Sequence, residues 1–428
     1  MSKSEGTIRD FITFLDRSPT AWHAVAEIER KLEKTGFHKL DERMAWHLQG
    51  GKKYFVIRND SSLLAFILPS KKPTRALVVG THTDSPGFRI KPHAEVRKDN
   101  MVMLGAEIYG APLLTSWLNR DLGVAGRVIT ADRHGKIQTR LVTCASHPMV
   151  IPQLAIHLDR DVNDKGLLLD KQEHLMVLAA LDTRLGRGSY LEMLLKEHLS
   201  REKLLASELF LYPLDGARRV GHDGEMISSY RLDNLGSAHA ALEALCTAHS
   251  SNPTLKIAAF WDHEEIGSLT AQGAASPFFT DVLERICLSY KMEREEEIRL
   301  RIGSLCLSVD LAHAYHPSFP DRHDSQHKAL MDRGIVLKEN ALQRYISDAT
   351  TTAALMVLAK KAKVSLQRYV NHNAQRGGAT FGPIHAAGTG MPTIDIGYPQ
   401  LSMHSAREIA SCRDHLSMIQ FLKQVYKE

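Results

Sequence analysis

Two adjacent glutamates, Glu264 and Glu265, are the residue pair best suited to chemistry in this chain. They follow the apolar run 255–261 and precede Gly267. Such a run is typical of a buried strand, and open α/β sheets place their ligands in the turn after a strand. Two neighbouring carboxylates are costly unless a cation holds one of them. One could ligate a metal while the other moves a proton, as in a hydrolytic metal site, although a solvated acidic turn is the alternative.

Other candidate ligands also stand near the ends of strand-like runs. His82 and Asp84 follow the run 76–80, and in such a His-x-Asp pair the imidazole can bind a metal while the carboxylate orients it. Asp310 ends the run 305–310, and His404 follows the strand-like 393–397. Each of the histidines, taken singly, is more often structural. Asp233 opens a helix, where an N-cap role is the simpler reading.

Taken together, these residues favour a metal site, which none of them indicates alone. Two imidazoles and three carboxylates form the ligand set for two zinc-like ions that share one carboxylate. The set contains no thiolate, which favours catalytic over structural zinc. Manganese and cobalt would suit the same ligands. The five predicted ligands are His82, Asp233, Glu265, Asp310 and His404.

Strands and helices alternate over much of the chain, which predicts a mostly parallel sheet covered by helices, an α/β fold. Residues 8–35 have a helical pattern interrupted at Ser18-Pro19. The predicted strands lie at 54–58, 63–68, 76–80, 255–261, 305–310 and 366–370, and the later helices at 236–249, 278–291 and 347–361.

The segment 91–230 has a different pattern, with short strand-like runs and a helix at 189–199. The runs lie at 101–104, 107–109, 126–130 and 137–143. We therefore expect a β-rich insertion that divides one α/β catalytic domain into the segments 1–90 and 231–428.

Composition excludes several classes of protein. With 428 residues, 43% of them apolar, the chain can bury a large core and a second domain. The net charge of +5 comes from interspersed charges rather than a basic stripe, so nucleic-acid binding is not expected. No apolar run approaches the roughly 20 residues of a membrane span. Five scattered cysteines without a Cys-x-x-Cys pair indicate reduced thiols and a cytoplasmic protein.

The chemical segments, in their order along the chain, resemble the aspartyl aminopeptidase family of co-catalytic zinc metallopeptidases, in a bacterial-type member. The resemblance runs from 18–25 to 403–408, nearly the whole chain. Its motifs are His-Thr-Asp-Ser-Pro at 82–86, Arg-Leu-Asp-Asn at 231–234, Glu-Glu-Ile-Gly-Ser at 264–268, Ser-Val-Asp-Leu-Ala-His-Ala at 308–314 and Gly-Pro-Ile at 382–384.

The resemblance implies two zinc ions per chain, a general base and a residue that orients a ligand. In the implied assignment, one zinc is held by His82 and Asp310, the second by Glu265 and His404, and Asp233 bridges them, while Asp84 orients His82 and Glu264 is the base. The base would take a proton from the attacking water and return it to the leaving amine.

The resemblance also implies peptide substrates with N-terminal Asp or Glu, bound by His313, Lys338 and Tyr345. A lysine supplies the cation that a side-chain carboxylate needs, although a surface lysine is the plain alternative. His157 would reach the active site of a neighbouring subunit, because family members dimerise through the insertion and assemble into dodecamers. This chain departs from the family pattern at Ala374 and Gly377, where the family commonly has an acidic residue and a cysteine.

The leading hypothesis is therefore a cytosolic dizinc aminopeptidase that removes N-terminal Asp or Glu from peptides. Two alternatives keep the same scaffold: a preference for neutral residues or for acyl-amino acids, and a non-catalytic scaffold protein. A non-catalytic member should have lost a ligand or the base, and this chain retains them all.

Overall fold

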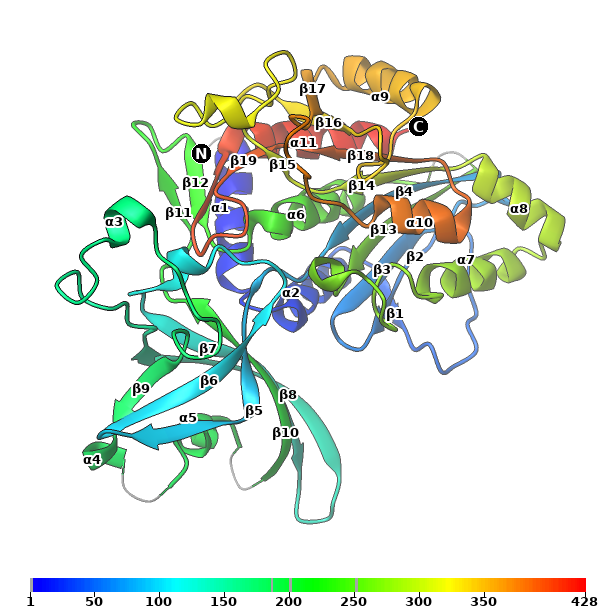
Figure 1. The fold of residues 1–428 in the computed structure, drawn as a ribbon. Coiled ribbons are helices and arrows are strands. Elements are labelled where there is room, and N and C mark those ends of the chain that lie inside the picture. The colour runs from blue at the N-terminus through cyan, green and yellow to red at the C-terminus, as the bar shows by residue number, and fades with distance from the viewer. Residues whose placement is uncertain (1–2, 186–187, 200–201, 251–252) are drawn as a thin grey trace. The chain divides into compact units, whose positions relative to one another are not determined.

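The computed structural model of the chain describes residues 3–185, 188–199, 202–250 and 253–428 (Figure 1). These residues form two compact units. Unit 1 comprises Met1–Asp84, Ala217–Met403 and Glu408–Glu428, and unit 2 comprises Ser85–Gly216 and His404–Arg407.

Unit 1 is built on a nine-stranded sheet in the order β1-β2-β3-β13-β4-β14-β18-β16-β17. Its central strands β13, β4, β14 and β18 are parallel to their neighbours in this group, and the antiparallel pairs lie to either side. The predicted α/β fold is confirmed. The strands are β1 (His38–Leu40), β2 (Lys53–Arg58), β3 (Ser62–Ile67), β4 (Arg75–His82), β13 (Thr254–Trp261), β14 (Leu305–Val309), β16 (Ile335–Glu339), β17 (Leu366–Val370) and β18 (Thr393–Gly397).

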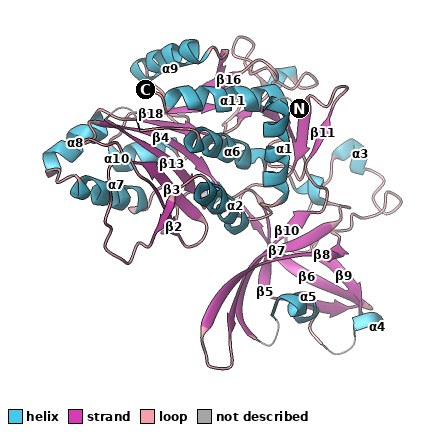
Figure 2. Ribbon diagram, turned by 180° about the vertical axis from the view of Figure 1, so that it is seen from behind, coloured by secondary structure: helices cyan, strands magenta, loops and turns pink. Residues whose placement is uncertain are grey.

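Helices cover both faces of this sheet (Figures 1 and 2). In β4, Leu77 and Val79 join a core with helices α6 and α11, whereas Ala76 and Val78 join a second core with helix α7. The alternation follows from the two-residue period of a strand. The helices are α1 (Lys3–Asp16), α2 (Ala21–Lys34), α6 (Leu232–Cys246), α7 (Phe278–Ser289), α8 (Arg294–Ile302), α9 (Ala349–Ala362), α10 (Gly382–Thr389) and α11 (Cys412–Val425).

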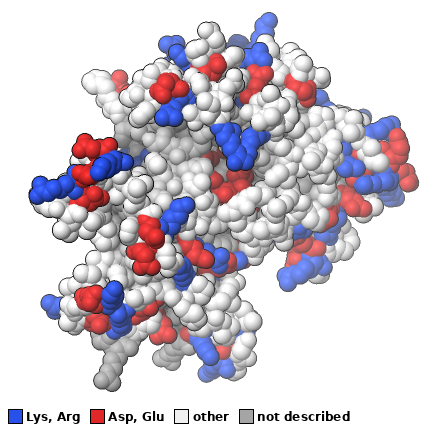
Figure 3. Space-filling view, in the orientation of Figure 1, with Lys and Arg blue, Asp and Glu red and all other residues white. Residues whose placement is uncertain are grey.

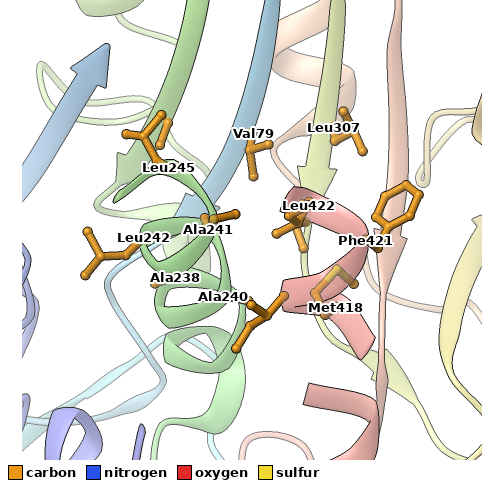
Figure 4. Packing of buried hydrophobic residues seen from close by; sticks show 14 of the residues in the cluster. Val79, Ala238, Ala240, Ala241, Leu242, Leu245, Leu307, Met418, Phe421 and Leu422 are labelled. Carbon is orange, nitrogen blue, oxygen red and sulfur yellow. The ribbon is translucent and has the colours of Figure 1, made fainter. Parts of the chain in front are cut away.

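The first of these cores fixes the helix that carries Asp233. Figure 4 shows side chains of α6 and α11, among them Ala241 and Leu422, close to Val79 and Leu307 of the sheet. All four are buried. Since small alanines on α6 allow close packing, the helix is held firmly against the strands that end at the candidate ligands.

Unit 1 also contains a small sheet, and the structure describes short 3-10 helices in both units. The small sheet has the order β11-β12-β20-β19-β15. Its strands are β11 (Arg218–Val220), β12 (Met226–Ser229), β15 (Ala312–His313), β19 (Pro399–Leu401) and β20 (Glu408–Ser411), and the 3-10 helices are η1 (Leu114–Trp117), η2 (Glu264–Ile266) and η3 (Pro320–Arg322).

Unit 2 contains a six-stranded sheet in the order β8-β7-β10-β5-β6-β9, whose pairs are antiparallel. The strands are β5 (Gly87–Lys98), β6 (Met101–Tyr109), β7 (Leu122–Ala131), β8 (Ile137–Met149), β9 (Val177–Leu181) and β10 (Lys203–Pro213), and the helices are α3 (Val162–Lys165), α4 (Asp182–Leu185) and α5 (Tyr190–Leu199). The predicted start of the insertion, 91, falls inside β5, whereas unit 2 begins at Ser85. The predicted end, 230, is later than Gly216 because β11 and β12 pair with each other and with β20 of unit 1.

Most predicted elements are present, with corrections at their ends. The predicted strands 101–104 and 107–109 are wrong as separate elements, because β6 continues through Gly105 as a single strand. The predicted helix 236–249 begins earlier, at Leu232. Predicted helix 8–35 consists of α1 and α2, separated near Ser18-Pro19 as expected.

Surface features agree with the composition. On the face that Figure 3 shows, basic and acidic side chains lie next to one another rather than in separate stripes. Among the described residues, no helix has both the length and the apolar character needed to cross a bilayer.

Candidate metal centre

Three neighbouring strands end at the candidate site. Strands β13, β4 and β14 are adjacent and parallel, with Trp261 paired to His82 and Ser308 paired to Gly80. Their carboxyl ends therefore meet at one edge of the sheet, where open α/β sheets bind ligands. His82 ends β4, Asp310 directly follows β14, and the two glutamates form helix η2 just after β13.

Two carboxylates face the same nitrogen of His82. Its Nε2 lies 3.4 Å from Oδ1 of Asp233 and 3.5 Å from Oδ1 of Asp310. On the other side of the ring, Nδ1 lies 3.1 Å from the main-chain carbonyl of Asp84. A proton on Nδ1 would be donated to that carbonyl, which leaves the Nε2 lone pair directed at the two carboxylates. This is the tautomer of a metal-ligating histidine.

The residues present fit a zinc ion. Atoms that share a tetrahedral zinc, at about 2.1 Å each, are roughly 3.4 Å apart. The separations of His82 Nε2 from Asp233 and Asp310 match this value. Glu264 and Glu265 also place ligand atoms within 4.8 Å of a ligand atom of His82 and of each other. A buried set of carboxylates around one imidazole is the donor chemistry that a cation stabilises.

The electrostatics of the centre also favour a cation. Burial alone would lower the pKa of His82, but the carboxylates of Asp233, Asp310 and Asp84 raise it well above its usual value. Burial raises the pKa of Glu264 well above 4.5; His82 opposes this shift, and the negative charge of Glu265 adds to it. The neighbouring carboxylates contribute to both shifts, and a bound cation would offset their negative charge.

Asp84 has contacts with the glutamate turn in addition to its contacts with His82. Its Oδ1 accepts a hydrogen bond from the Glu264 N–H at 3.2 Å, and its Oδ2 accepts one from the Glu265 N–H at 3.1 Å. Oδ1 is also 3.4 Å from His82 Nδ1, farther than the Asp84 carbonyl is. The carboxylate of Asp84 therefore fixes the turn that carries both glutamates, while its carbonyl orients the ring of His82.

Asp233 is held by contacts that the local sequence pattern does not reveal. Its N–H donates to Oε2 of the buried Glu408 at 3.0 Å. The side chain of Asn234 donates to the Val309 carbonyl at 2.8 Å, next to Asp310. An N-cap role for Asp233 is wrong, because the N-cap residue of α6 is Arg231; Asp233 lies at a kink just inside the helix.

Arg231 links two segments of the centre. It is buried, and its guanidinium donates to the carbonyl of Thr83 and, at 3.1 Å, to that of Pro19. Thr83 stands between His82 and Asp84, so this side chain fastens the start of α6 to the end of β4. Sequence reasoning missed this role of Arg231, and of Glu408 and Asn234, although all three lie in the motifs of the resemblance.

The predicted substrate residues Lys338 and Tyr345 lie together. The reading of Lys338 as a surface residue is wrong, because it is buried in β16. Its ammonium donates to Asp310 Oδ2 at 3.0 Å and to the Leu311 carbonyl at 3.2 Å, and it lies 5.0 Å from the centroid of the Tyr345 ring. Burial lowers the pKa of Lys338, but Asp310, Asp395 and Tyr345 together outweigh this effect and the pKa is raised.

His313 belongs to strand β15, and its ring centroid lies 6.2 Å from that of Tyr369. Tyr345 and Tyr369 are also neighbours, with centroids 6.4 Å apart. The three predicted substrate residues thus share an aromatic neighbourhood, with Tyr369 as an additional member that the sequence reasoning did not name.

The remaining two predicted residues belong to unit 2. His404 begins the short segment 404–407, and its Nδ1 lies 3.1 Å from the Ala111 carbonyl. His157 is exposed in a turn, between Ile156 and Leu158, which are also exposed. The parts assigned to these two histidines, as a zinc ligand and as a residue donated to a neighbouring subunit, stay predictions.

Comparison with known proteins shows similarity along nearly the whole chain. Residues 14–426 match the family described as "Aminopeptidase I zinc metalloprotease (M18)". A relative named "Probable M18 family aminopeptidase 2", from Pseudomonas paraeruginosa, is 39% identical over 423 residues, covering 97% of this chain and 96% of the relative.

Solved structures of similar proteins share the fold. One described as "Cryo-EM structure of the Ape4 and Nbr1 complex" has a TM-score of 0.95 and 32% identity, covering 99% of this chain and 86% of the other. A second, "Structure of S. cerevesiae mApe1 dodecamer", has a TM-score of 0.87 and 26% identity, covering 99% of this chain and 97% of the other.

Proposed function

The chain belongs to the M18 family of zinc aminopeptidases, and from this membership we propose that it removes N-terminal Asp or Glu from peptides with two bound zinc ions. As a member of the family it is a zinc-dependent hydrolase and an exopeptidase. The substrate preference, the number of ions and the role of each residue are the proposed part.

The observation that carries the proposal is the arrangement around His82. One imidazole nitrogen faces the carboxylates of Asp233 and Asp310 at distances typical of shared metal coordination, and Glu264 and Glu265 lie beside them. The proposed ligand set is His82 and Asp310 for one ion, Glu265 and His404 for the other, with Asp233 between them.

The chain's own residues would divide the work of hydrolysis. Bound zinc supplies Lewis-acid chemistry, which makes a water more acidic and polarises the scissile carbonyl. Glu264 would take the proton of the attacking water and deliver it to the leaving amine. Asp84 would keep Glu264 in place through the hydrogen bond to its main chain.

The proposed acidic preference rests on Lys338. Its ammonium has three N–H groups, two of which are used by Asp310 and Leu311, so a third is available for a substrate carboxylate. In this arrangement Lys338 would donate hydrogen bonds both to Asp310, a proposed metal ligand, and to the substrate carboxylate. The resemblance assigns His313 and Tyr345 to the same pocket.

The loop with the unusual Ala374 and Gly377 lies near this pocket. Arg344 donates to the Gly377 carbonyl at 3.0 Å, and a Cβ on Gly378 would be 3.6 Å from the Tyr345 hydroxyl. Because the loop packs on the segment that carries Tyr345, its departure from the family pattern favours testing a neutral-residue preference as the second candidate.

A panel of aminoacyl-anilides with Asp, Glu, Leu and Lys separates the two candidates. We expect Glu and Asp substrates to have the highest kcat/KM, and Lys338→Gln to lower kcat/KM more for Glu than for Leu. A Leu substrate cleaved much faster than Glu would overturn the acidic preference but not the zinc-dependent activity. Metal analysis of the same protein tests whether two zinc ions bind per chain.

We also propose a homo-oligomer that forms dimers through the insertion and a dodecamer from them. The similar mApe1 structure is described as a dodecamer. In unit 2, the exposed apolar side chains of Leu154, Ile156 and Leu158 give a surface that a second copy could cover. His157 lies within this segment. Light scattering measures the mass of the particle directly. A cytoplasmic location remains a proposal that rests on the five cysteines, all of which are free thiols.

A further inference from the structure

A line of four hydrogen-bonded side chains crosses the core of unit 1 on the α6 face of the sheet. Asp10 of α1 contacts His239 of α6, with 3.0 Å between Oδ2 and Nε2. His239 Nδ1 lies 3.0 Å from Nε2 of His415 of α11. His415 Nδ1 lies 3.2 Å from the hydroxyl of Tyr398. We call these four residues, Asp10, His239, His415 and Tyr398, the relay.

The acceptors in the relay fix where its protons lie. An ionised Asp10 can only accept, so His239 must donate from Nε2 and accept at Nδ1. His415 must then donate from Nε2 and accept at Nδ1, which requires the Tyr398 hydroxyl to donate. Every hydrogen bond therefore points toward Asp10, and each neutral ring uses its single proton.

The surroundings keep the relay neutral and rigid. The side chains of His239, His415 and Tyr398 are fully buried, and Phe11 stacks on His415 with 3.9 Å between ring centroids. Burial lowers the pKa of both histidines and raises that of Tyr398 well above 10. A fully satisfied buried network of this kind allows few alternative arrangements.

At the outer end of the relay, a lysine already pairs with Asp10. Asp10, His239 and Glu243 have ligand atoms close enough to hold a metal ion. The ammonium of Lys31 lies there instead, 2.6 Å from Asp10 Oδ2 and paired also with Glu243. This cluster is therefore an anchor for the relay rather than a second metal site.

The inner end of the relay touches two of the segments that bear proposed metal ligands. A Cβ on Gly236 would lie 2.1 Å from the Tyr398 hydroxyl, so this oxygen packs directly on α6 three residues after Asp233. The Tyr398 carbonyl accepts a hydrogen bond from the Ala312 N–H at 3.0 Å, two residues after Asp310. Tyr398 thus contacts the chain beside two of the proposed ligands, Asp233 and Asp310.

We propose that Tyr398 is a positioning residue for the metal centre, with its hydroxyl held by a relay that ends at the surface carboxylate of Asp10. The inference rests on the proposed roles of Asp233 and Asp310 as ligands. Removal of a residue that holds a metal ligand in place, without binding the metal itself, lowers metal affinity by about 10–100-fold. Because Tyr398 contacts the main chain beside the ligands, we expect its removal to lower zinc affinity by about 10-fold, the lower end of this range.

The first test compares Tyr398→Phe with Tyr426→Phe in the full-length chain, by competition for zinc with a chromophoric chelator. Tyr426 is a matched control, because its buried hydroxyl also makes one hydrogen bond, to the Ile257 carbonyl at 2.7 Å, in the same core. We expect both variants to lower the Tm, but only Tyr398→Phe to weaken zinc binding, by about 10-fold. Unchanged zinc affinity in Tyr398→Phe would overturn the proposal.

The second test asks whether the relay transmits the effect. Asp10→Ala removes the final acceptor, whereas Asp10→Asn keeps an acceptor oxygen but loses the charge that pairs with Lys31. We expect Asp10→Ala to weaken zinc binding and Asp10→Asn to bind zinc as the parent does. In the double variant with Tyr398→Phe, the losses should not add, because both act through one chain of contacts. Additive losses would contradict a relay.

Two outcomes keep this inference separate from the proposed function. A parent protein that binds no zinc contradicts the proposed metal centre itself. A parent that binds zinc, and loses it on Asp233→Asn, while both relay variants bind normally, contradicts the relay alone. Should Tyr398→Phe fail to fold, the comparison of Asp10→Ala with Asp10→Asn at the surface still decides.

Discussion

At the scale of single residues, adjacent side chains at one turn have different tasks. The carboxylate of Asp84 receives the main-chain N–H groups of both Glu264 and Glu265, so it holds the two glutamates in one orientation. Their side chains are then fixed close to His82. We propose different roles for the two side chains, with Glu265 as a metal ligand and Glu264 as the group that transfers the proton.

This division predicts opposite results for two substitutions of the same kind. Glu264→Gln should retain zinc while turnover falls by on the order of 10²-fold or more, because the general base is removed. Glu265→Gln should weaken zinc binding by more than the roughly 10–100-fold seen for outer partners. Zinc content by atomic spectroscopy and kcat at saturating zinc measure the two effects. Full turnover in Glu264→Gln would refute its role.

At the scale of elements, the site depends on strands that approach closely at their ends. Gly397 ends β18, and a Cβ there would lie 2.0 Å from the Asp310 carbonyl. No side chain fits between the two strands without moving the segment that carries Asp310. The glycine therefore permits the register in which the Asp310 N–H donates to the Ile396 carbonyl at 2.9 Å.

We predict that Gly397→Ala lowers both stability and zinc affinity, because the added methyl displaces Asp310. Overpacking of this kind costs about 1–3 kcal/mol of folding free energy. Gly126→Ala is a matched control, since its Cβ would lie 2.0 Å from the Glu208 carbonyl in the sheet of unit 2. Urea unfolding and zinc titration of both variants are the measurements. Equal zinc affinity in the two variants would show that Gly397 does not position Asp310.

At the scale of the whole molecule, stability also depends on buried groups that are not among the proposed site residues. His385 of α10 is fully buried against Phe279, with ring centroids 4.7 Å apart, and burial lowers its pKa to about 4. The unfolded chain binds a proton there below about pH 6.5, whereas the folded chain does not until about pH 4. Folding stability is therefore lost as the pH falls through this window.

His385→Leu should make stability less sensitive to acid. Between pH 7 and pH 5, this histidine accounts for a loss of about 2 kcal/mol in the unfolding free energy, which the variant should not show. Urea unfolding at both pH values, with zinc removed by a chelator from both proteins, separates this effect from protonation of the metal ligands. Parallel losses in the two proteins would mean that His385 does not titrate between the folded and unfolded states as described.

Much of the fold was predictable because it depends on local patterns. Apolar runs such as 255–261 identify strands wherever they lie, and Ser18-Pro19 separates two helices by its own chemistry. The predictions of domain limits are wrong where a strand pairs with a segment that is far away in the sequence. Strand β12 pairs with β20, about 180 residues away, and no local signal assigns β12 to unit 1 rather than unit 2.

The same distinction applies to the site. The sequence by itself predicts the donor chemistry, since residue types and their places after strands indicate imidazole and carboxylate ligands for catalytic zinc. Only the tertiary structure decided that Asp84 serves the glutamate turn, that Lys338 is bound to Asp310, and that Glu408 and Arg231 hold the ligand segments. Ligand types are a property of side chains, whereas their positioning depends on contacts between segments that only folding brings together.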